Sequence, residues 1–236
     1  MKTNLISTSP MTLARFAGFL YLIVVPLGIY GTIIIPSKLI IPGDAAATAA
    51  NLTTSESLFR LGIVLHILAP LFMLAVSLVL YQVLKSVDRN MAMLMVILVM
   101  LGVSTDLVNR GNQLAALRLL GGAEYLNVFT PEQLQALALF YLRLPGNIPT
   151  IFWGLWLFPL GYLVFKSGFL PKFLGGLLMV SCFMYLVDTF ASILGYSVNI
   201  GMFGAIGEVL FILWLLAKGV DTERWKAVQT ISTEGI

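Results

Sequence analysis

The chain has 236 residues, of which 59% are hydrophobic and 11% are charged, with 14 Lys and Arg against 11 Asp and Glu. Soluble globular domains carry about 45–50% apolar and about 25% charged residues, so the composition excludes an ordinary soluble enzyme and a disordered chain. A net charge of +3 without a dense basic tract argues against a nucleic-acid partner. The single Cys182 and single His66 exclude an intrachain disulfide and a Cys/His zinc site.

A helix that crosses a bilayer needs about 20 mostly apolar residues, and six stretches of the chain meet that requirement. In chain order they run over residues 13–35, 58–84, 91–118, 146–165, 173–194 and 198–217. The first stretch is too long for a cleavable signal peptide and lacks a small-residue cleavage site. The sequence therefore predicts an all-α, polytopic membrane helix bundle of six transmembrane helices, which forms a single membrane domain over residues 1–236.

The distribution of Lys and Arg predicts how this bundle is oriented. With the N-terminus inside, nine basic residues fall in inner segments and four in outer ones, which is the expected cytoplasmic excess. An even number of spans then places both termini in the cytoplasm. We expect a multi-pass protein of the cell membrane, the bacterial cytoplasmic membrane, with outer loops at 36–54 and 119–145 and a cytoplasmic tail at 218–236.

The predicted outer loops contain two patterns that are typical of helix N-caps. Thr130-Pro131-Glu132-Gln133 combines a capping Thr with Pro at the first helical position and Gln at the third. It predicts a short amphipathic helix near residues 131–144 that stops at Pro145-Gly146. Thr53-Thr54-Ser55-Glu56 is a second capping-box pattern, and it predicts the start of the second long helix.

Three segments resemble a known family. They are ARFAGFLYL at residues 14–22, the entry to the second span at residues 51–60 with Asn51-Leu52, Glu56 and LFR at residues 58–60, and KSGFLPKFLG at residues 166–175. Together they resemble the bacterial integral membrane proteins of the family DUF4386. The resemblance implies a six-helix membrane protein, and it supplies no catalytic residue because the family's name records an unknown function.

Five ionisable side chains fall within the predicted spans: His66, Asp106, Arg110, Asp188 and Glu208. An ionisable group in a span costs about 2.5–3.5 kcal/mol on insertion scales, so each one is a candidate functional residue. Counted at a rise of about 1.5 Å per residue, all five fall between the middle of the bilayer and its outer edge.

Helical spacing groups these residues with further polar side chains on single faces. Asp106 and Arg110 share a stripe of the third span with Asn109 and Gln113, and Tyr185 lies on the stripe of Asp188 in the fifth span. Stripes on several helices predict one polar pocket in the outer half of the bilayer. Its candidate residues are His66, Asp106, Asn109, Arg110, Gln113, Tyr185, Asp188 and Glu208.

Three functions remain open at this point. The first is binding or transport of a small solute or cation through that pocket. The second is an intramembrane enzyme that acts on a lipid or headgroup and binds a metal ion, with His66, Asp106, Asp188 and Glu208 as the candidate ligands. The third is a structural or sensory membrane partner without chemistry, in which Asp106 pairs with Arg110, and Asp188 pairs with Arg110 or His66. The sequence assigns no catalytic residue, and it leaves a homo-oligomer open.

Overall fold

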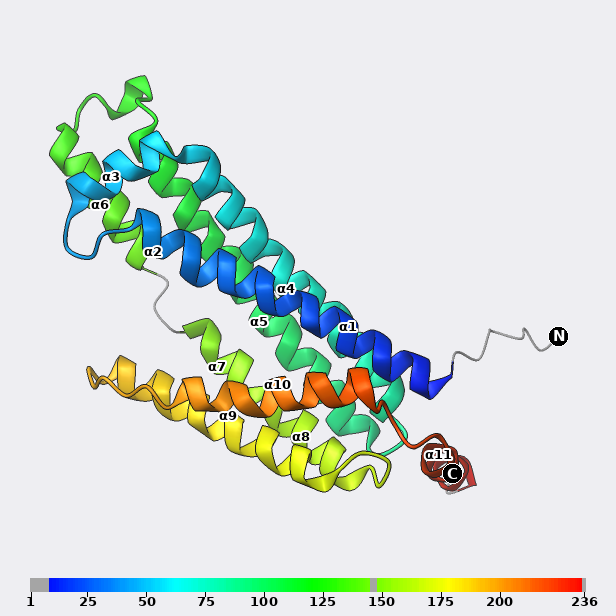
Figure 1. Cartoon of the computed structure of the whole chain (residues 1–236). Coiled ribbons are helices and arrows are strands. Elements are labelled where there is room, and N and C mark those ends of the chain that lie inside the picture. The colour runs from blue at the N-terminus through cyan, green and yellow to red at the C-terminus, as the bar shows by residue number, and fades with distance from the viewer. Residues whose placement is uncertain (1–8, 145–147, 235–236) are drawn as a thin grey trace. The chain divides into compact units, whose positions relative to one another are not determined.

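A computed structural model describes residues 9–144 and 148–234 of the chain. Every regular element in these residues is a helix, and Figure 1 shows their order. The elements are α1 (Pro10–Gly28), the π-helix η1 (Ile29–Ile34), α2 (Ile35–Leu39), α3 (Ala45–Thr54), α4 (Glu56–Leu84), α5 (Arg89–Leu120), the 3-10 helix η2 (Glu124–Leu126), α6 (Pro131–Arg143), α7 (Ile148–Leu155), α8 (Leu157–Lys166), α9 (Lys172–Ile193), α10 (Gly201–Ala217) and α11 (Thr222–Glu234). The predicted all-α class is confirmed.

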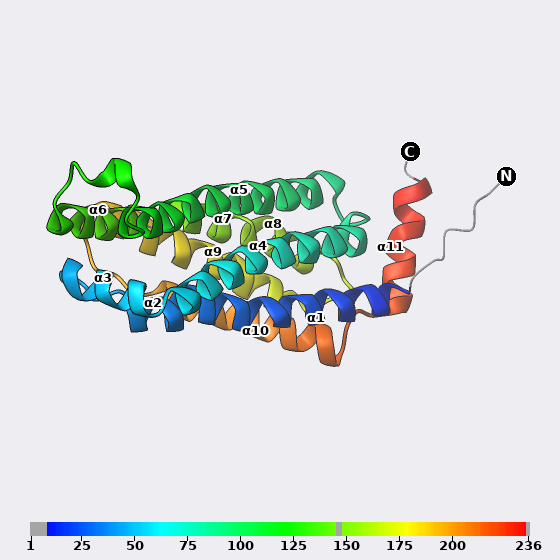
Figure 2. The ribbon, with the colours of Figure 1, turned by 90° about the horizontal axis from the view of Figure 1, so that it is seen from above.

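Five helical stretches of the described residues are long and apolar enough to cross a membrane: Pro10–Leu39, Glu56–Leu84, Arg89–Leu120, Pro131–Lys166 and Lys172–Ile193. A sixth candidate is formed by α10 together with α11, whose axes are bent by 98° at the break between them. Figure 2 shows α11 turned away from the direction of α10. The chain is therefore a helical membrane protein with five or six spans, while the orientation of its termini stays a prediction. The predicted fourth span, 146–165, begins in residues that lie outside the described ones.

The chain divides into two compact units. Unit 1 contains the described residues within 1–22, 72–102 and 149–236, and unit 2 contains those within 23–71 and 103–148. Helices α1, α4 and α5 each begin in one unit and end in the other. The single membrane domain and the exact spans proposed from the sequence stay predictions.

Proline accounts for a break within the fourth stretch. The helix between Ile148 and Lys166 is interrupted at Trp156, which separates α7 from α8. Pro159 has no N–H to donate to the carbonyl of Leu155 four residues earlier, and its ring crowds that carbonyl. The series of backbone hydrogen bonds is therefore interrupted at Trp156, one residue after Leu155.

In unit 1, α9 packs against α8 and α10, as Figure 1 shows. Glycine permits the first of these contacts, because a Cβ atom at Gly175 would lie 2.5 Å from the carbonyl oxygen of Gly161. At the other end of the chain, the indole Nε1 of Trp225 in α11 donates to the carbonyl oxygen of Val83, 2.9 Å away. That bond joins α11 to the end of α4.

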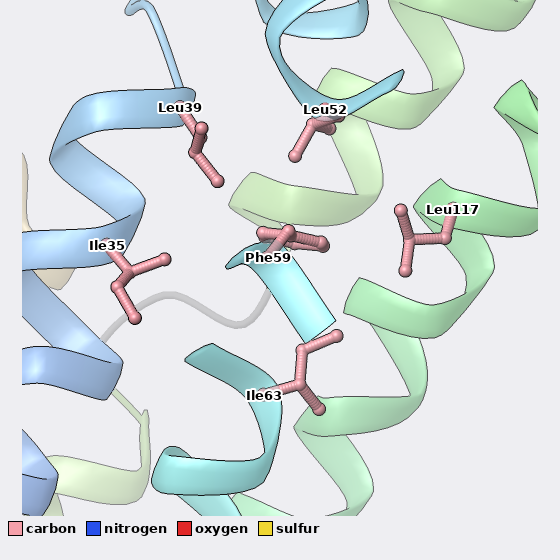
Figure 3. Packing of buried hydrophobic residues seen from close by; sticks show 6 residues of the cluster. All are labelled: Ile35, Leu39, Leu52, Phe59, Ile63 and Leu117. Atoms are coloured by element: carbon pink, nitrogen blue, oxygen red, sulfur yellow. The ribbon is translucent and has the colours of Figure 1, made fainter. Parts of the chain in front are cut away.

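In unit 2, a cluster of buried hydrophobic side chains joins α2, α3, α4 and α5 (Figure 3). Phe59 is 1% exposed and Leu52 is fully buried, and both project into this cluster. Its other members are Ile35, Leu39, Ile63 and Leu117. α3 also packs against α6, which places the predicted amphipathic helix on a neighbouring helix of the same unit.

The two capping predictions had different outcomes. At α6 the capping box forms as expected, with the Thr130 hydroxyl accepting from the Gln133 N–H and the Gln133 side chain accepting from the Thr130 N–H. The second prediction holds for the start of the helix, since α4 begins at Glu56, but it is wrong for the cap, because Thr53 lies in α3 and its hydroxyl donates to the carbonyl of Ala49, 2.8 Å away. Helix α3 was not predicted from the sequence, although Asp44 caps it by accepting from the Ala47 N–H at 2.8 Å.

Candidate functional site

Unit 1 holds the carboxylate of Glu208 between two tyrosines. The hydroxyl of Tyr185 in α9 donates to Oε1 of Glu208 at 2.8 Å, and the hydroxyl of Tyr21 in α1 donates to Oε2. Tyr21 is only 3% exposed, and its ring lies 5.9 Å from that of Trp156, centroid to centroid. Each oxygen of one carboxylate is thus bound by a different helix.

Small residues on α10 bring that helix close enough to α9 for this contact. A Cβ atom at Gly207 would lie 2.6 Å from the hydroxyl oxygen of Ser181, and one at Gly204 would lie 3.4 Å from the carbonyl oxygen of Ser181. The hydroxyl of Ser181 in turn donates to the carbonyl of Gly204 at 2.7 Å. Glycines aligned on one helix face let two backbones approach, and Glu208 then lies beside Tyr185.

Asp188 serves a different purpose in the same unit. Its Oδ1 accepts from the backbone N–H of Ile200 at 3.2 Å, and Ile200 is the residue that precedes the first turn of α10. A carboxylate at this end of a helix satisfies an N–H group that has no partner within the helix, and it interacts favourably with the helix dipole. Asp188 therefore caps α10 from α9.

Unit 2 holds the other ionisable residues of the predicted pocket. Nη1 of Arg110 lies 2.8 Å from Nδ1 of His66, and Nε of Arg110 donates to the backbone carbonyl of Asp106 at 3.2 Å. The Oδ1 atom of Asp106 lies 3.8 Å from Nη2 of Arg110 and 3.8 Å from Nε2 of His66. Arg110 and Asp106 are both buried, at 7% and 8% exposure.

This arrangement defines the tautomer of His66. An arginine guanidinium only donates hydrogen bonds, so Nδ1 of His66 must accept and the ring proton must sit on Nε2, which faces Asp106. The histidine is therefore neutral in this geometry. The backbone of η1 approaches that of His66 closely, since a Cβ atom at Gly31 would lie 2.8 Å from the His66 backbone nitrogen.

The residues of the predicted pocket are divided between the two units. His66, Asp106, Asn109, Arg110 and Gln113 belong to unit 2, and Tyr185, Asp188 and Glu208 belong to unit 1. Asn109 is half-buried on α5. The side-chain oxygen of Gln113 is buried, and no group of the described residues donates a hydrogen bond to it. The pocket as a whole stays a prediction.

The proposed metal ligands are divided in the same way, with His66 and Asp106 in unit 2 and Asp188 and Glu208 in unit 1. Within neither unit do three His, Cys, Asp or Glu side chains of the described residues converge closely enough to hold a metal ion. In unit 2, Arg110 pairs with Asp106 and donates to His66, and in unit 1, Asp188 and Glu208 accept hydrogen bonds.

The hydrogen bond of Tyr21 to Glu208 was not predicted from the sequence. Tyr21 stands within an apolar stretch and belongs to no polar stripe of the first span. The one available signal is its hydroxyl, since a tyrosine buried in hydrocarbon requires a hydrogen-bond partner.

Comparison with known proteins identifies the family. The family model described as "Domain of unknown function (DUF4386)" matches residues 16–219. The chain belongs to this family. The resemblance seen in the three sequence segments is thereby confirmed.

One relative is an uncharacterized protein of Archaeoglobus fulgidus. It is 42% identical to this DUF4386 protein over 97 residues, which cover 40% of the chain and 59% of the relative. The match therefore spans less than two thirds of the relative's length. No solved structure matches the chain.

Proposed function

We propose that this protein binds and transports a small cation, a proton or a metal cation such as Na⁺, and that the carboxylate of Glu208 is the binding group. One observation carries the proposal. Both oxygens of Glu208 are bound by tyrosine hydroxyls, and in the part of the chain that the structure describes no Lys, Arg or His side chain forms an ion pair with it.

The electrostatics of a membrane span support this reading. A charge in the hydrocarbon region costs about 2.5–3.5 kcal/mol on insertion scales, and such residues mark proton relays and ion pathways. Hydroxyl dipoles stabilise a carboxylate but carry no net charge, so Tyr21 and Tyr185 cannot neutralise Glu208. A bound cation or proton supplies the missing positive charge.

The two tyrosines also give the site two hydrogen-bonding states. An ionised carboxylate accepts from both hydroxyls, and the two contacts of Glu208 fit that state. When one oxygen takes up a proton it becomes a donor, and the hydroxyl facing it then has to accept. A tyrosine hydroxyl can do either, so uptake of a proton by Glu208 reverses the hydrogen bond that α10 makes to α1 or the one that it makes to α9.

Ion flux into liposomes tests the proposal. The purified full-length protein is reconstituted, and a pH-sensitive or sodium-sensitive dye inside the vesicles follows the response to an imposed gradient of protons or of Na⁺. We expect flux of at least one cation above protein-free liposomes, and a loss of about tenfold or more in Glu208→Gln, which keeps the side-chain shape but removes the charge.

Asp188→Asn is the matched control, because it removes a carboxylate of the same unit that caps a helix and retains the acceptor oxygen. We expect it to transport like the wild type. Equal flux in Glu208→Gln and the wild type, or no flux of either cation in the wild type, would overturn the proposal.

A further inference from the structure

A cavity of about 700 Å³ opens in unit 2, at the beginning of α4 and the end of α5. It shares no residue with the His66–Asp106–Arg110 cluster or with the Glu208 site. Its lining residues are Glu56, Arg60, Leu114, Leu117, Arg118, Gly121, Ala123 and Tyr125. The cavity is therefore separate from the proposed cation site.

The charges at this cavity favour an anion. Arg60 and Arg118 both line it, and Glu56 is the one acidic residue among the lining side chains. Glu56 already pairs with Arg60, with 2.7 Å between its Oε1 and the Nε of Arg60. Arg118 makes no ion pair within the described residues, which leaves the lining with one net positive charge. That charge matches a ligand with a single negative charge.

The surface next to the two arginines is apolar. On α5, Leu114 and Leu107 precede Arg118 by one and three helical turns, and they are 39% and 38% exposed. On α4, Val64 and Leu68 follow Arg60 by one and two turns and are 50% and 36% exposed. Because residues four apart share a helix face, each guanidinium stands at the end of an exposed apolar stripe.

We propose that this cavity binds the phosphodiester headgroup of an anionic phospholipid. The guanidiniums of Arg60 and Arg118 donate to the phosphate oxygens, for which a planar guanidinium has the matching geometry. The acyl chains lie along the apolar stripes of α4 and α5. Tyr125, 72% exposed at the cavity, presents a further hydroxyl to the headgroup.

The ligand is distinguished from free phosphate by its chains. A phosphodiester carries one negative charge and brings apolar chains that cover Leu107, Leu114 and Val64, whereas inorganic phosphate makes use of the arginines alone. A zwitterionic lipid such as phosphatidylcholine offers the same phosphate, but its choline places a positive charge near Arg118. We therefore expect phosphatidylglycerol to bind more tightly than either.

The experiment is a binding titration of the purified full-length protein in a neutral detergent. Short-chain phosphatidylglycerol, short-chain phosphatidylcholine and inorganic phosphate are the three probes. Arg118→Gln is the test variant, because Arg118 is exposed and its replacement leaves the Glu56–Arg60 pair in place. Arg143→Gln is the matched control, since Arg143 is an exposed arginine in the last turn of α6 that does not line the cavity.

We expect Arg118→Gln to weaken the binding of phosphatidylglycerol about tenfold, as the loss of one charge-assisted contact of about 1.4 kcal/mol would do. Arg143→Gln should bind like the wild type, and phosphatidylcholine should bind less tightly than phosphatidylglycerol. Equal weakening by the two variants would overturn the proposal by showing a diffuse effect of surface charge. Displacement of phosphatidylglycerol by equimolar inorganic phosphate would also overturn it, in favour of a site for free phosphate.

Discussion

In unit 2 the carboxylate of Asp106 faces the guanidinium of Arg110 and the ring of His66, whereas in unit 1 the carboxylate of Glu208 faces two tyrosine hydroxyls. The first group of side chains carries its own counter-charge on the same helix. The second is stabilised by dipoles and lacks a cationic side-chain partner among the described residues. Polar residues within the spans therefore differ in kind: Asp106 pairs with Arg110, whereas Glu208 is the residue that we propose to bind an ion or a proton.

Asp188 shows a third use of an acidic residue in a span. Among the described residues it forms no ion pair, and its Oδ1 accepts from the backbone N–H of Ile200 at the start of α10. This contact favours the structural interpretation for Asp188, as the ion pair does for Asp106 and Arg110. The functional interpretation rests on Glu208, and the following substitutions test the contrast.

We expect the largest effect on stability from Arg110→Leu. It leaves Asp106 buried without its counter-charge, and removing one partner of a buried pair costs about 3–5 kcal/mol. Thermal unfolding of the detergent-solubilised protein measures the loss. The double variant Asp106→Leu/Arg110→Leu should recover at least half of it, because no unpaired charge remains. A double variant that is less stable than Arg110→Leu would show that the two residues do not act as a neutral pair.

Tyr185→Phe should have an intermediate effect, which depends on Glu208. It removes one of two donors to the carboxylate, and a hydrogen bond to a charged group contributes about 1.5–3 kcal/mol. We expect the substitution to cost at least about 1 kcal/mol more in the wild type than in the Glu208→Gln background. Unfolding of the four proteins of this cycle gives that difference. If the cost is the same in both backgrounds, Tyr185 acts by packing and the carboxylate does not need its hydroxyl.

The smallest effect is expected at the cap of α10. Asp188→Ala removes the acceptor for the Ile200 N–H, and loss of a helix cap costs about 1 kcal/mol. Asp188→Asn retains an acceptor oxygen and should lose only a fraction of that in the same unfolding measurement. An equal loss in both variants would indicate that the charge of Asp188, and not its hydrogen bond, holds the helix.

The sequence predicted the parts of the fold that depend on local pattern. Apolar runs predicted the long helices, since the hydrocarbon region requires a satisfied backbone and a minimum length of about 20 residues. The capping box at Thr130 and Gln133 could also be predicted from the sequence, because these residues lie three apart and hydrogen-bond one another directly. At Thr53 the same pattern located the start of α4 but not its cap, since Thr53 belongs to α3 and its hydroxyl donates to the carbonyl of Ala49.

The partners of the polar residues were decided by the tertiary structure. Helical spacing placed Asp106 beside Arg110, but it could not show that His66 accepts from Arg110 across 44 residues or that Tyr21 binds Glu208 across 187. Both contacts join helices that are far apart in the chain, α4 with α5 and α1 with α10. Close approach of the second pair is seen at Gly18 of α1, where a Cβ atom would lie 2.9 Å from the Cβ of Leu215 in α10. Composition and periodicity thus determined that this is a helical membrane protein with charged groups in its spans. Packing between distant helices decided which of those charges are neutralised, because only close contact in three dimensions brings a counter-charge or a hydroxyl to a carboxylate.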